Sequence, residues 1–579
     1  MTRERTAGRG DLLVALVVTL VALGPVLLRR GYILRGDMVF VPDQPWKDAW
    51  LGLDGAPPRS VPMDAVVWAL SVPLPGDVVQ KLFLAMTLLG AGIGAARLVS
   101  GLPLAARAAS AISFAWNPWV DQRLAIGQWA IVAGYAAMPW VVLAALKLGR
   151  RLPGGWPALA VAWGVTGLTG PSSALMAGAV ALIVLMTARE WRSLPAAGGL
   201  WLLVNLPWLV PALVGPGVEP STGGQFAGFA ARSESSLGLV PSVLSLGGIW
   251  KESVVPPIRT EPLVVLLAAM WVVLALIAAA AALRRGTTPG PLGRTGMSAL
   301  FVVAAGGLAL ALMPALPGGA TGLDAMAESF PPTGLLRDSH RYLAPAALLV
   351  AVGAALLVRS VLERAARRGP DSLRGVALLL VVWPVLCLPT LAWGRAGWFE
   401  PVDYPSAWYT VRQQIERAGR DSVTVVLPWH GSYRGFEWND HRAMLDPAPR
   451  FLPGVVLVDD RVMLDDRNLT SEQPRLGPIT NALAGPDPTD RLVDLGVTHV
   501  LVEEQPGTAN FVPEGSVVVE RGGLMLVRLH ARATDAPTYQ LGGAARAAVI
   551  AGDVVAGGLL VGGLAVMAAS RRRWMYALR

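Results

Sequence analysis

The chain has 579 residues, of which 53% are hydrophobic and only 15% charged, with a mean hydropathy of +0.50. Because soluble domains carry about a quarter charged residues, this composition excludes an ordinary soluble protein and indicates that most of the chain lies in lipid. The net charge of +9 and the pI near 10.1 would suit nucleic acid, but the charges stand at the ends of apolar runs, so we predict no nucleic-acid partner. A single cysteine, Cys387, excludes disulfides within the chain.

Apolar runs recur along the chain at the length that spans a hydrocarbon core of about 30 Å. They predict about 12 transmembrane helices, the first of which is retained because no small-residue cleavage site follows it. Arginine-rich short loops alternate with arginine-poor ones, which predicts a multi-pass protein of the cell membrane with both termini in the cytoplasm. The predicted helices are 11–28, 79–99, 103–118, 128–147, 155–169, 172–188, 196–214, 262–283, 296–314, 342–358, 374–393 and 546–569.

The composition changes abruptly after the eleventh predicted helix. Residues 394–541 combine charges and prolines with alternating patterns of period two that the predicted helical body lacks. We therefore predict an α-helical polytopic membrane protein with a small extracytoplasmic α/β domain inserted before the last helix and the basic tail of 542–579. Two outer loops of the helical body, 29–78 and 215–261, are too long to be mere connectors and are expected to carry function.

Sequence patterns also predict individual elements of the domain at 394–541. Trp408, Val411 and Ile415 have helical spacing within 404–418, and 422–427 reads as a buried strand. A second strand is predicted at 497–502, after a helix that starts near residue 488. A hairpin is predicted from 516–520 and 524–529 around Gly522-Gly523.

Four carboxylates stand close together in the loop 29–78, namely Asp37, Asp43, Asp48 and Asp64. A carboxylate at the outer membrane face can act as a general base that deprotonates an acceptor hydroxyl. We predict Asp37 in this role, with Asp43 as its substitute. The alternative is that Asp37 and Asp43 are turn residues, Asp43 standing between Pro42 and Pro45.

A basic cluster lies just outside the tenth predicted helix and contains Arg337, His340 and Arg341. Guanidinium groups bind phosphates in a bidentate manner, so we predict that this cluster, with Arg123, binds a donor phosphate. The alternative is that these arginines extend to the membrane interface, with a local pair between Arg337 and Asp338.

Tryptophans accompany both sets of polar residues. Trp46 and Trp119 lie in outer segments of the helical body, and Trp429 and Trp438 flank an aromatic and polar loop of the distal domain. We predict that these four rings contact a sugar or a glycan acceptor. An interfacial aromatic belt is the alternative for Trp119 and its neighbours.

Several common catalytic motifs are absent from the sequence. There is no Walker loop, HExxH motif, Cys/His metal set or Gly-x-Ser-x-Gly elbow, which argues against an ATPase, a zinc protease or a serine hydrolase. We predict no protein-bound metal site and no resident cofactor, while the sequence leaves a divalent cation requirement open.

The layout resembles the GT-C superfamily of polytopic glycosyltransferases. In that family the catalytic acid follows the first helix, which corresponds to the segment from Gly36-Asp37 to Asp43. Asn117-Pro118-Trp119 to Gly127-Gln128, Met138-Pro139-Trp140 and Leu495 to Val502 are similar to actinobacterial envelope arabinosyl- and mannosyltransferase-like proteins. The resemblance implies a polyprenyl-phosphate sugar as donor and an envelope glycan or glycolipid as acceptor. The family's two adjacent acids are absent, since six positions separate Asp37 and Asp43.

These observations favour an inverting membrane glycosyltransferase that acts at the outer leaflet. A lipid or polysaccharide transporter is the alternative from another class, although few polar residues run through the predicted helices. A catalytically inactive GT-C-like assembly partner is a third reading, because the paired acids are missing.

Overall fold

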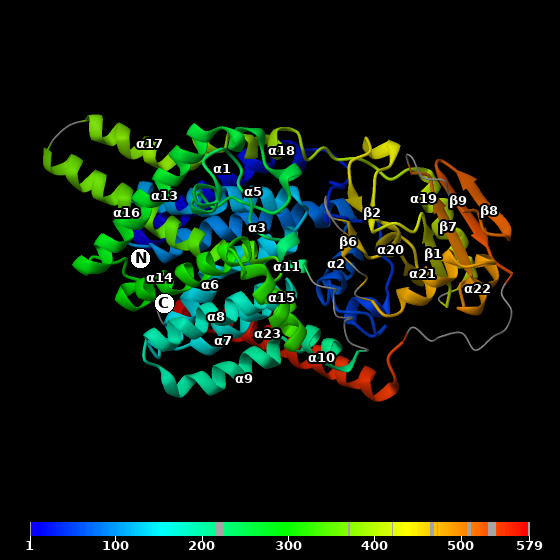
Figure 1. The fold of residues 1–579 in the computed structure, drawn as a ribbon. Helices are drawn as coiled ribbons and strands as arrows, with labels where there is room; N and C mark the ends of the chain where they lie inside the picture. The colour runs from blue at the N-terminus through cyan, green and yellow to red at the C-terminus, as the bar shows by residue number, and fades with distance from the viewer. Residues whose placement is uncertain are drawn as a thin grey trace.

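The fold consists of a bundle of long apolar helices with a β-sheet at one end of it (Figure 1). The computed structural model describes residues 2–215, 224–368, 371–419, 421–463, 468–469, 471, 473–505, 511–530 and 540–576. Residues 216–223 of the predicted loop 215–261 and residues 577–579 of the predicted basic tail lie outside the described residues.

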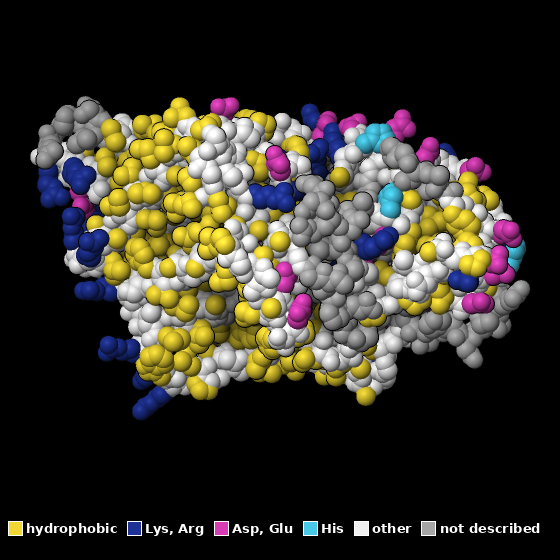
Figure 2. Space-filling model, in the orientation of Figure 1, with side chains coloured by type: hydrophobic (Ala, Val, Ile, Leu, Met, Phe, Trp, Pro, Cys, Tyr) yellow, Lys and Arg dark blue, Asp and Glu magenta, His cyan; other side chains and the backbone are white. Residues whose placement is uncertain are grey.

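Seven helices in the described part of the chain are long and apolar enough to cross a membrane. Their runs of alanine, leucine and valine leave many large apolar side chains exposed on the bundle surface, where lipid would cover them (Figure 2). The chain is therefore a membrane protein. These helices are α1 (Thr2–Leu28), α3 (Gly76–Leu98), α6 (Trp129–Gly149), α13 (Pro262–Arg285), α14 (Gly293–Leu312), α16 (Ala344–Arg368) and α23 (Gly543–Tyr576).

Three of the predicted transmembrane helices are shorter than a membrane span. The 12 residues of α4 (Leu104–Ala115) extend only about 18 Å at 1.5 Å per residue, and most of them are buried inside the bundle. The neighbouring α7 (Gly155–Leu168) and α8 (Pro171–Thr187) have 14 and 17 residues. Apolar composition alone does not distinguish such internal helices from spanning ones.

Two more of the predicted helices are broken by a sharp bend. In the segment 196–214 the helices α9 (Leu194–Val204) and α10 (Leu206–Val214) belong to a pair bent by 71°. In the segment 374–393, α17 (Asp371–Cys387) is followed by a turn at Pro389, and that pair is bent by 67°. Because proline lacks the amide N–H, it does not continue a helical ladder. By length and composition the described residues give up to nine spans, so the predicted number of 12 is not confirmed.

The centre of the bundle is α16, which packs against α4, α13, α14 and α17. Ala347, Ala351, Ala354 and Ala355 on this helix are fully buried. Small side chains let membrane helices approach closely and gain dispersion contacts. The remaining helices of the body are short: α2 (Met63–Ser71), α5 (Pro118–Ala125), α11 (Gln225–Gly228), α12 (Leu239–Leu244), α15 (Gly319–Ser329) and α18 (Ala392–Ala396).

The distal part of the chain forms a mixed five-stranded sheet in the order β4-β1-β7-β9-β8. The strand β1 is parallel to β4 and β7, while β9 is antiparallel to β7 and β8. The sequence predicted β1, β7 and the β8–β9 hairpin, because their alternating or fully apolar patterns are typical of strands. The strands are β1 (Val423–Leu427), β4 (Val455–Leu457), β7 (His499–Glu503), β8 (Ser516–Arg521) and β9 (Leu524–Arg528).

Short helices and two small ribbons complete this part. The predicted helix 404–418 is α19 (Ser406–Ala418), which buries Trp408, Val411 and Ile415. Two-residue strands pair as β2 with β3 and β5 with β6. The other elements are α20 (Ala448–Phe451), α21 (Leu476–Ala484), α22 (Pro488–Asp494), β2 (Tyr433–Arg434), β3 (Met444–Leu445), β5 (Val462–Met463) and β6 (Asn468–Leu469).

The first loop of the body joins the bundle to the sheet. The Tyr404 hydroxyl donates to the Phe40 carbonyl at 3.0 Å, and Tyr32 pairs with Val402 through backbone hydrogen bonds. Four ion pairs also link residues of 29–78 to the distal part. They are Asp43–Arg412 at 3.2 Å, Asp54–Arg475 at 2.9 Å, Arg59–Asp460 at 2.8 Å and Asp64–Arg450 at 3.1 Å.

A fully buried ionic group lies where the β2–β3 ribbon meets β7. Arg434 Nε contacts Glu503 Oε2 at 2.8 Å and Asp446 Oδ2 at 3.3 Å, and all three side chains are inaccessible to solvent. Burial raises the pKa of Glu503 well above its usual range, and the neighbouring Asp446 carboxylate raises it further. One guanidinium thus faces two carboxyl groups. We infer that these two carboxyl groups together retain one proton in the folded state.

We predict that the free energy of unfolding falls less with rising pH in the Glu503→Gln variant than in the wild type. A group whose folded-state pKa is raised contributes stability that is fully present below its ordinary pKa of about 4.5 and is lost as the pH rises towards the folded-state value. The wild-type full-length chain should therefore unfold at a lower temperature at pH 8 than at pH 5, and Glu503→Gln should narrow that difference. Thermal unfolding in detergent checks this. The exposed neighbour supplies the control, Glu504→Gln, and an equal effect of both variants would contradict the assignment.

Candidate functional site

The candidate site is organised around the short buried helix α5. The Asn117 side chain accepts a hydrogen bond from the Val120 N–H at 3.1 Å and so caps the helix, and Pro118 occupies its first turn. Asp121, Gln122 and Arg123 follow within the helix, and all three are fully buried. Since successive residues of a helix point about 100° apart, the three side chains reach three different neighbours.

Two of these side chains fasten segments that are distant in sequence. Asp121 is paired with Arg395 of α18 through contacts of 2.9 and 3.2 Å. Gln122 donates to Glu234, whose carboxylate also accepts a hydrogen bond from Arg259 Nε at 2.8 Å and one from the Gly248 N–H at 2.7 Å. The helix thereby holds the segment after α17 and the segment 231–259 against the bundle.

The third side chain, Arg123, makes a bidentate ion pair with Asp338, at 2.5 and 2.8 Å. Arg341 Nε lies 2.9 Å from the same carboxylate. Burial alone would raise the pKa of Asp338, but the charges of Arg123 and Arg341 hold it well below its usual range. The carboxylate is therefore ionised.

His340 completes this cluster as a neutral imidazole. Its Nδ1 lies 2.8 Å from Arg123 Nη2, which can only donate, so Nδ1 accepts. Its Nε2 lies 2.9 Å from the carbonyl oxygen of Gly247, to which it donates. We call Arg123, Asp338, His340 and Arg341 the Asp338 cluster.

The Asp338 cluster changes how the predicted phosphate-binding residues are understood. Arg123, His340 and Arg341 do come together, but Arg123 and His340 are fully buried and bonded to protein groups, so this arrangement does not support direct phosphate binding by these two residues. Arg341 stays partly exposed, with a 3.2 Å contact to Ser172. Arg337 lies over the Phe229 ring at 5.4 Å from its centre. A phosphate-binding role for these two arginines stays a prediction.

Asp37 lies where the bundle meets the distal domain. Its carboxylate accepts a short hydrogen bond from the Tyr433 hydroxyl of β2, and its N–H donates to the Ile126 carbonyl at 2.9 Å. The preceding residue, Gly36, exchanges backbone hydrogen bonds of 2.9 and 2.8 Å with Ala443 and Leu445. Asp37 is thus held from both sides, by the end of α5 and by the β2–β3 ribbon.

Two glycines permit this close approach. Gly36 and Gly127 have φ values of +56° and +87°, in the left-handed region that favours glycine. A Cβ on Gly36 would lie 2.0 Å from the Ile126 carbonyl oxygen, and one on Gly127 would lie 2.4 Å from the Asp37 nitrogen. The position of Asp37 therefore depends on the absence of two side chains.

Two partly exposed cations, Lys251 and Arg35, have no carboxylate partner among the described residues of this region. The Lys251 ammonium lies 5.4 Å from the centre of the Tyr433 ring, and the Arg35 guanidinium stacks 3.7 Å from the Trp398 ring. Arg35 Nε is buried without a hydrogen-bond partner. Burial, with the like charges of Arg442 and Arg395, lowers the pKa of Arg35 to about 10.

Asp37 is also within electrostatic reach of α5. Burial lowers the pKa of Arg123, while the negative charges of Asp338 and, more weakly, Asp37 act in the opposite direction. The acid and the Asp338 cluster therefore belong to one region of the molecule. In this region a carboxylate that can take a proton lies near cationic groups that can stabilise a phosphate.

Asp43 lies in a different environment from Asp37. Its side chain is 72% exposed, and it is paired with Arg412 on α19 at 3.2 Å. This contact anchors the distal domain to the first loop. Asp43 therefore contributes to the domain junction, and its role as a substitute base stays a prediction.

The four tryptophans predicted to contact sugar differ in accessibility. Trp119 is fully buried and stacks on Tyr135 with ring centres 4.6 Å apart, so its prediction as a sugar-stacking residue is wrong. Trp438 stacks on Phe436 within an aromatic cluster, and Trp429 donates to Thr480 at 3.0 Å. Trp46 is 39% exposed and packs edge-on against Trp68. Sugar contact by Trp46, Trp429 and Trp438 stays a prediction.

Sequence reasoning missed Tyr433, which holds Asp37, and the cations Arg35 and Lys251. Arg35 stands two positions before Asp37, Tyr433 lies in the aromatic loop between Trp429 and Trp438, and Lys251 lies in the predicted outer loop 215–261. Each was in a segment expected to carry function, but no spacing links the three. Among the described residues no group of three or more His, Cys, Asp or Glu side chains is arranged to hold a metal ion.

No family model matches this sequence, and a comparison with curated proteins found no relative. Among solved structures, the chain is similar to arabinofuranosyltransferase AftD from mycobacteria, with 15% identity, 91% of this chain covered and a TM-score of 0.55. A mutant of the same enzyme matches with 16% identity, 90% coverage and a TM-score of 0.55. The chain spans 40–42% of the length of these neighbours. The similarity shows a GT-C-like fold.

We predict that the Asp338 cluster is a structural requirement. Asp338→Ala leaves the buried charge of Arg123 uncompensated and should lower the free energy of unfolding by about 3–5 kcal/mol. The double variant Arg123→Met/Asp338→Leu should recover much of this loss. The partly exposed pair of Arg442 and Glu400, 2.8 Å apart, provides the control, since Glu400→Gln should cost about 0–1 kcal/mol. Unfolding in detergent measures all three, and equal costs for Asp338→Ala and Glu400→Gln would refute the prediction.

Proposed function

We propose that this protein is a membrane glycosyltransferase that transfers a sugar from a polyprenyl-phosphate donor to an envelope glycan or glycolipid. The observation that carries the proposal is the position of Asp37, held by the hydroxyl of Tyr433, whose ring centre lies 5.4 Å from the Lys251 ammonium. The GT-C-like fold supports the class of reaction. The donor, the acceptor and activity itself are part of the proposal.

In the proposed reaction Asp37 acts as the general base. The acceptor hydroxyl loses its proton to the Asp37 carboxylate while its oxygen forms the new bond to the anomeric carbon of the donor sugar. The bond between that carbon and the phosphate oxygen breaks, and polyprenyl phosphate leaves with the electron pair. Attack from the face opposite the leaving group inverts the configuration.

The surrounding side chains would stabilise the two groups whose charge changes in this step, the Asp37 carboxylate and the leaving phosphate. Tyr433 donates to Asp37 and orients the carboxylate. Negative charge develops on the leaving phosphate, and the Arg35 and Lys251 cations would stabilise it in a partly buried site. The Asp338 cluster and α5 would keep these groups in place without contacting the sugar.

The orientation in the membrane is part of the same proposal. Lysine and arginine side chains gather at the end of the bundle away from the sheet (Figure 2), and the positive-inside rule assigns that end to the cytoplasm. Residues 394–541 and Asp37 would then face the cell exterior, where a polyprenyl-phosphate sugar rather than a nucleotide sugar serves as donor.

We predict that Asp37→Asn abolishes sugar transfer while Asp43→Asn retains it. Loss of a general base lowers the rate by about 10²–10⁴-fold, and the amide keeps the size of the side chain. The full-length protein in nanodiscs is incubated with radiolabelled polyprenyl-phosphate arabinose or mannose and a glycolipid acceptor, and labelled product is counted. Transfer by the wild type that survives Asp37→Asn would refute the site.

We further predict that Lys251→Met weakens use of the donor more than use of the acceptor. Removing a cation that faces the phosphate should raise the KM for the donor or lower kcat, while the acceptor KM changes little. Asp43→Asn, which should retain transfer, should not show this selectivity. If the wild-type protein moves labelled lipid-linked sugar across the bilayer of proteoliposomes without forming a glycosidic bond, the result would favour a transporter over a glycosyltransferase.

A further inference from the structure

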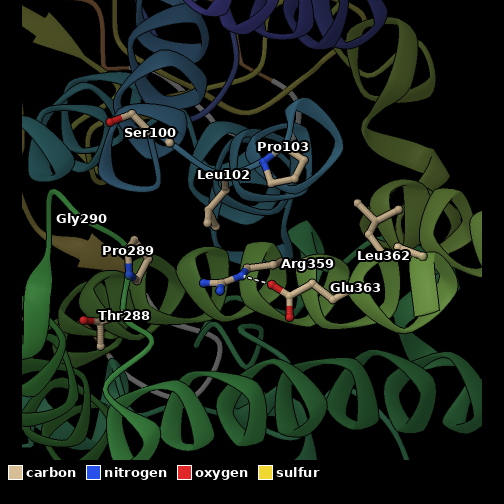
Figure 3. Close-up of a pocket in the computed structure, with 11 residues that line it drawn as sticks. Ser100, Leu102, Pro103, Thr288, Pro289, Gly290, Arg359, Leu362 and Glu363 are labelled. Carbon is tan, nitrogen blue, oxygen red and sulfur yellow. Dashed lines mark hydrogen bonds and ion pairs between the residues drawn. The ribbon is translucent and has the colours of Figure 1, made fainter.

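A cavity of about 590 Å³ lies at the end of the bundle away from the sheet. Three parts of the chain form it: the turn 99–103 between α3 and α4, the turn 286–292 between α13 and α14, and the last turns of α16 (Figure 3). Its size is within the range of about 300–1,000 Å³ that is typical of ligand sites. The function proposed above makes no use of this cavity.

The walls of the cavity combine apolar and polar side chains. Leu102, Pro103, Pro289 and Leu362 supply apolar surface, while the hydroxyls of Ser100 and Thr288 and the side chain of Arg359 supply polar groups. Figure 3 shows Arg359 between the two turns. A ligand that suits such walls has a polar head and an apolar portion.

Arg359 is oriented by its neighbours and keeps donors for a ligand. Its Nε donates to Glu363 at 2.6 Å, and its Nη1 donates to the Thr287 carbonyl at 3.2 Å. Its side chain is 28% exposed, and no contact of Nη2 is found within the described residues. The ion pair with Glu363 thus fixes the guanidinium while part of it faces the cavity.

The surroundings of the cavity are strongly basic. Arg97 and Arg285 stand three residues before the lining residues Ser100 and Thr288, and Arg364 and Arg367 follow Glu363 on α16. All four of these arginines are exposed. Glu363 is the one acidic residue that lines the cavity in the described part of the chain. Such a basic rim at the cytoplasmic end of a bundle attracts anionic lipid headgroups.

We propose that this cavity binds the phosphate headgroup of an anionic phospholipid of the cytoplasmic leaflet. Arg359, Ser100 and Thr288 contact the phosphate, and the start of an acyl chain lies against Leu102 and Leu362. The exposed arginines of the rim raise the local concentration of anionic lipid. The site is separate from the proposed sugar transfer and shares with it only the proposed orientation in the membrane.

Short-chain phosphatidylglycerol binding to the full-length protein in detergent, followed by native mass spectrometry, tests the proposal. Arg359→Gln should weaken binding by about tenfold, because a hydrogen bond to a charged group contributes about 1.5 kcal/mol. Arg192→Gln is the control, an exposed arginine on the turn after α8 that is not part of the cavity lining. Ala366→Trp places a bulky ring in the cavity from an exposed helix position without changing charge, and it should also weaken binding.

Three outcomes would overturn the proposal. Equal weakening by Arg359→Gln and Arg192→Gln would show attraction by overall charge instead of a site. Unchanged binding in Ala366→Trp would show that the cavity is not occupied. Inorganic phosphate that displaces the lipid at equal concentration would show a site for free phosphate. Phosphatidylcholine of the same chain length should bind at least about tenfold more weakly than phosphatidylglycerol, since its headgroup carries no net charge.

Discussion

The rest of the structure depends on the buried polar face of one short helix, α5. Three successive side chains, Asp121, Gln122 and Arg123, each fasten a segment that lies far away in sequence. Charges buried this deeply are tolerated only when each is paired, because the free-energy cost of desolvation would otherwise exceed the electrostatic attraction. The pairing therefore selects one arrangement of α18, of the segment 231–259 and of Asp338. The end of the same helix then receives the loop that carries Asp37.

The distal domain takes part in the candidate site and is more than an appended binding module. Its ribbon β2–β3 pairs with the backbone at Gly36, and its Tyr433 hydroxyl holds the Asp37 carboxylate. The ion pairs of the first loop with Arg412, Arg450, Arg475 and Asp460 fix this contact over a wide area. An acid on a loop would otherwise sample many orientations, and catalysis by a general base needs one of them.

The charged residues of this protein separate into two groups by their burial. Arg123 and His340 are fully buried and bonded to other groups of the protein, so they organise the fold. Arg35 and Lys251 are partly accessible and lack carboxylate partners in the described part of the chain, so they remain able to meet an anion. In this membrane protein with few charges, whether a cationic side chain has a carboxylate partner says more about its role than its residue type does.

The sequence by itself determined the membrane class, the position of the distal domain and several of its strands. These features depend on composition and periodicity, which are properties of residues close together in the sequence. It also pointed to Asp37 in the first loop and to the basic segment 337–341. The predicted number of 12 transmembrane helices is not confirmed, because an internal helix such as α4 is as apolar as a spanning one.

Only the tertiary structure decided which of the candidate residues meet. Asp37 and Asp43 are six residues apart, yet one faces Tyr433 and the other pairs with Arg412 on the surface. Arg123 and Asp338 are more than 200 residues apart and form one bidentate pair. Partners of this kind are determined by packing and by the need to neutralise buried charge. Both act between residues that are distant in sequence, so they produce no recognisable spacing pattern.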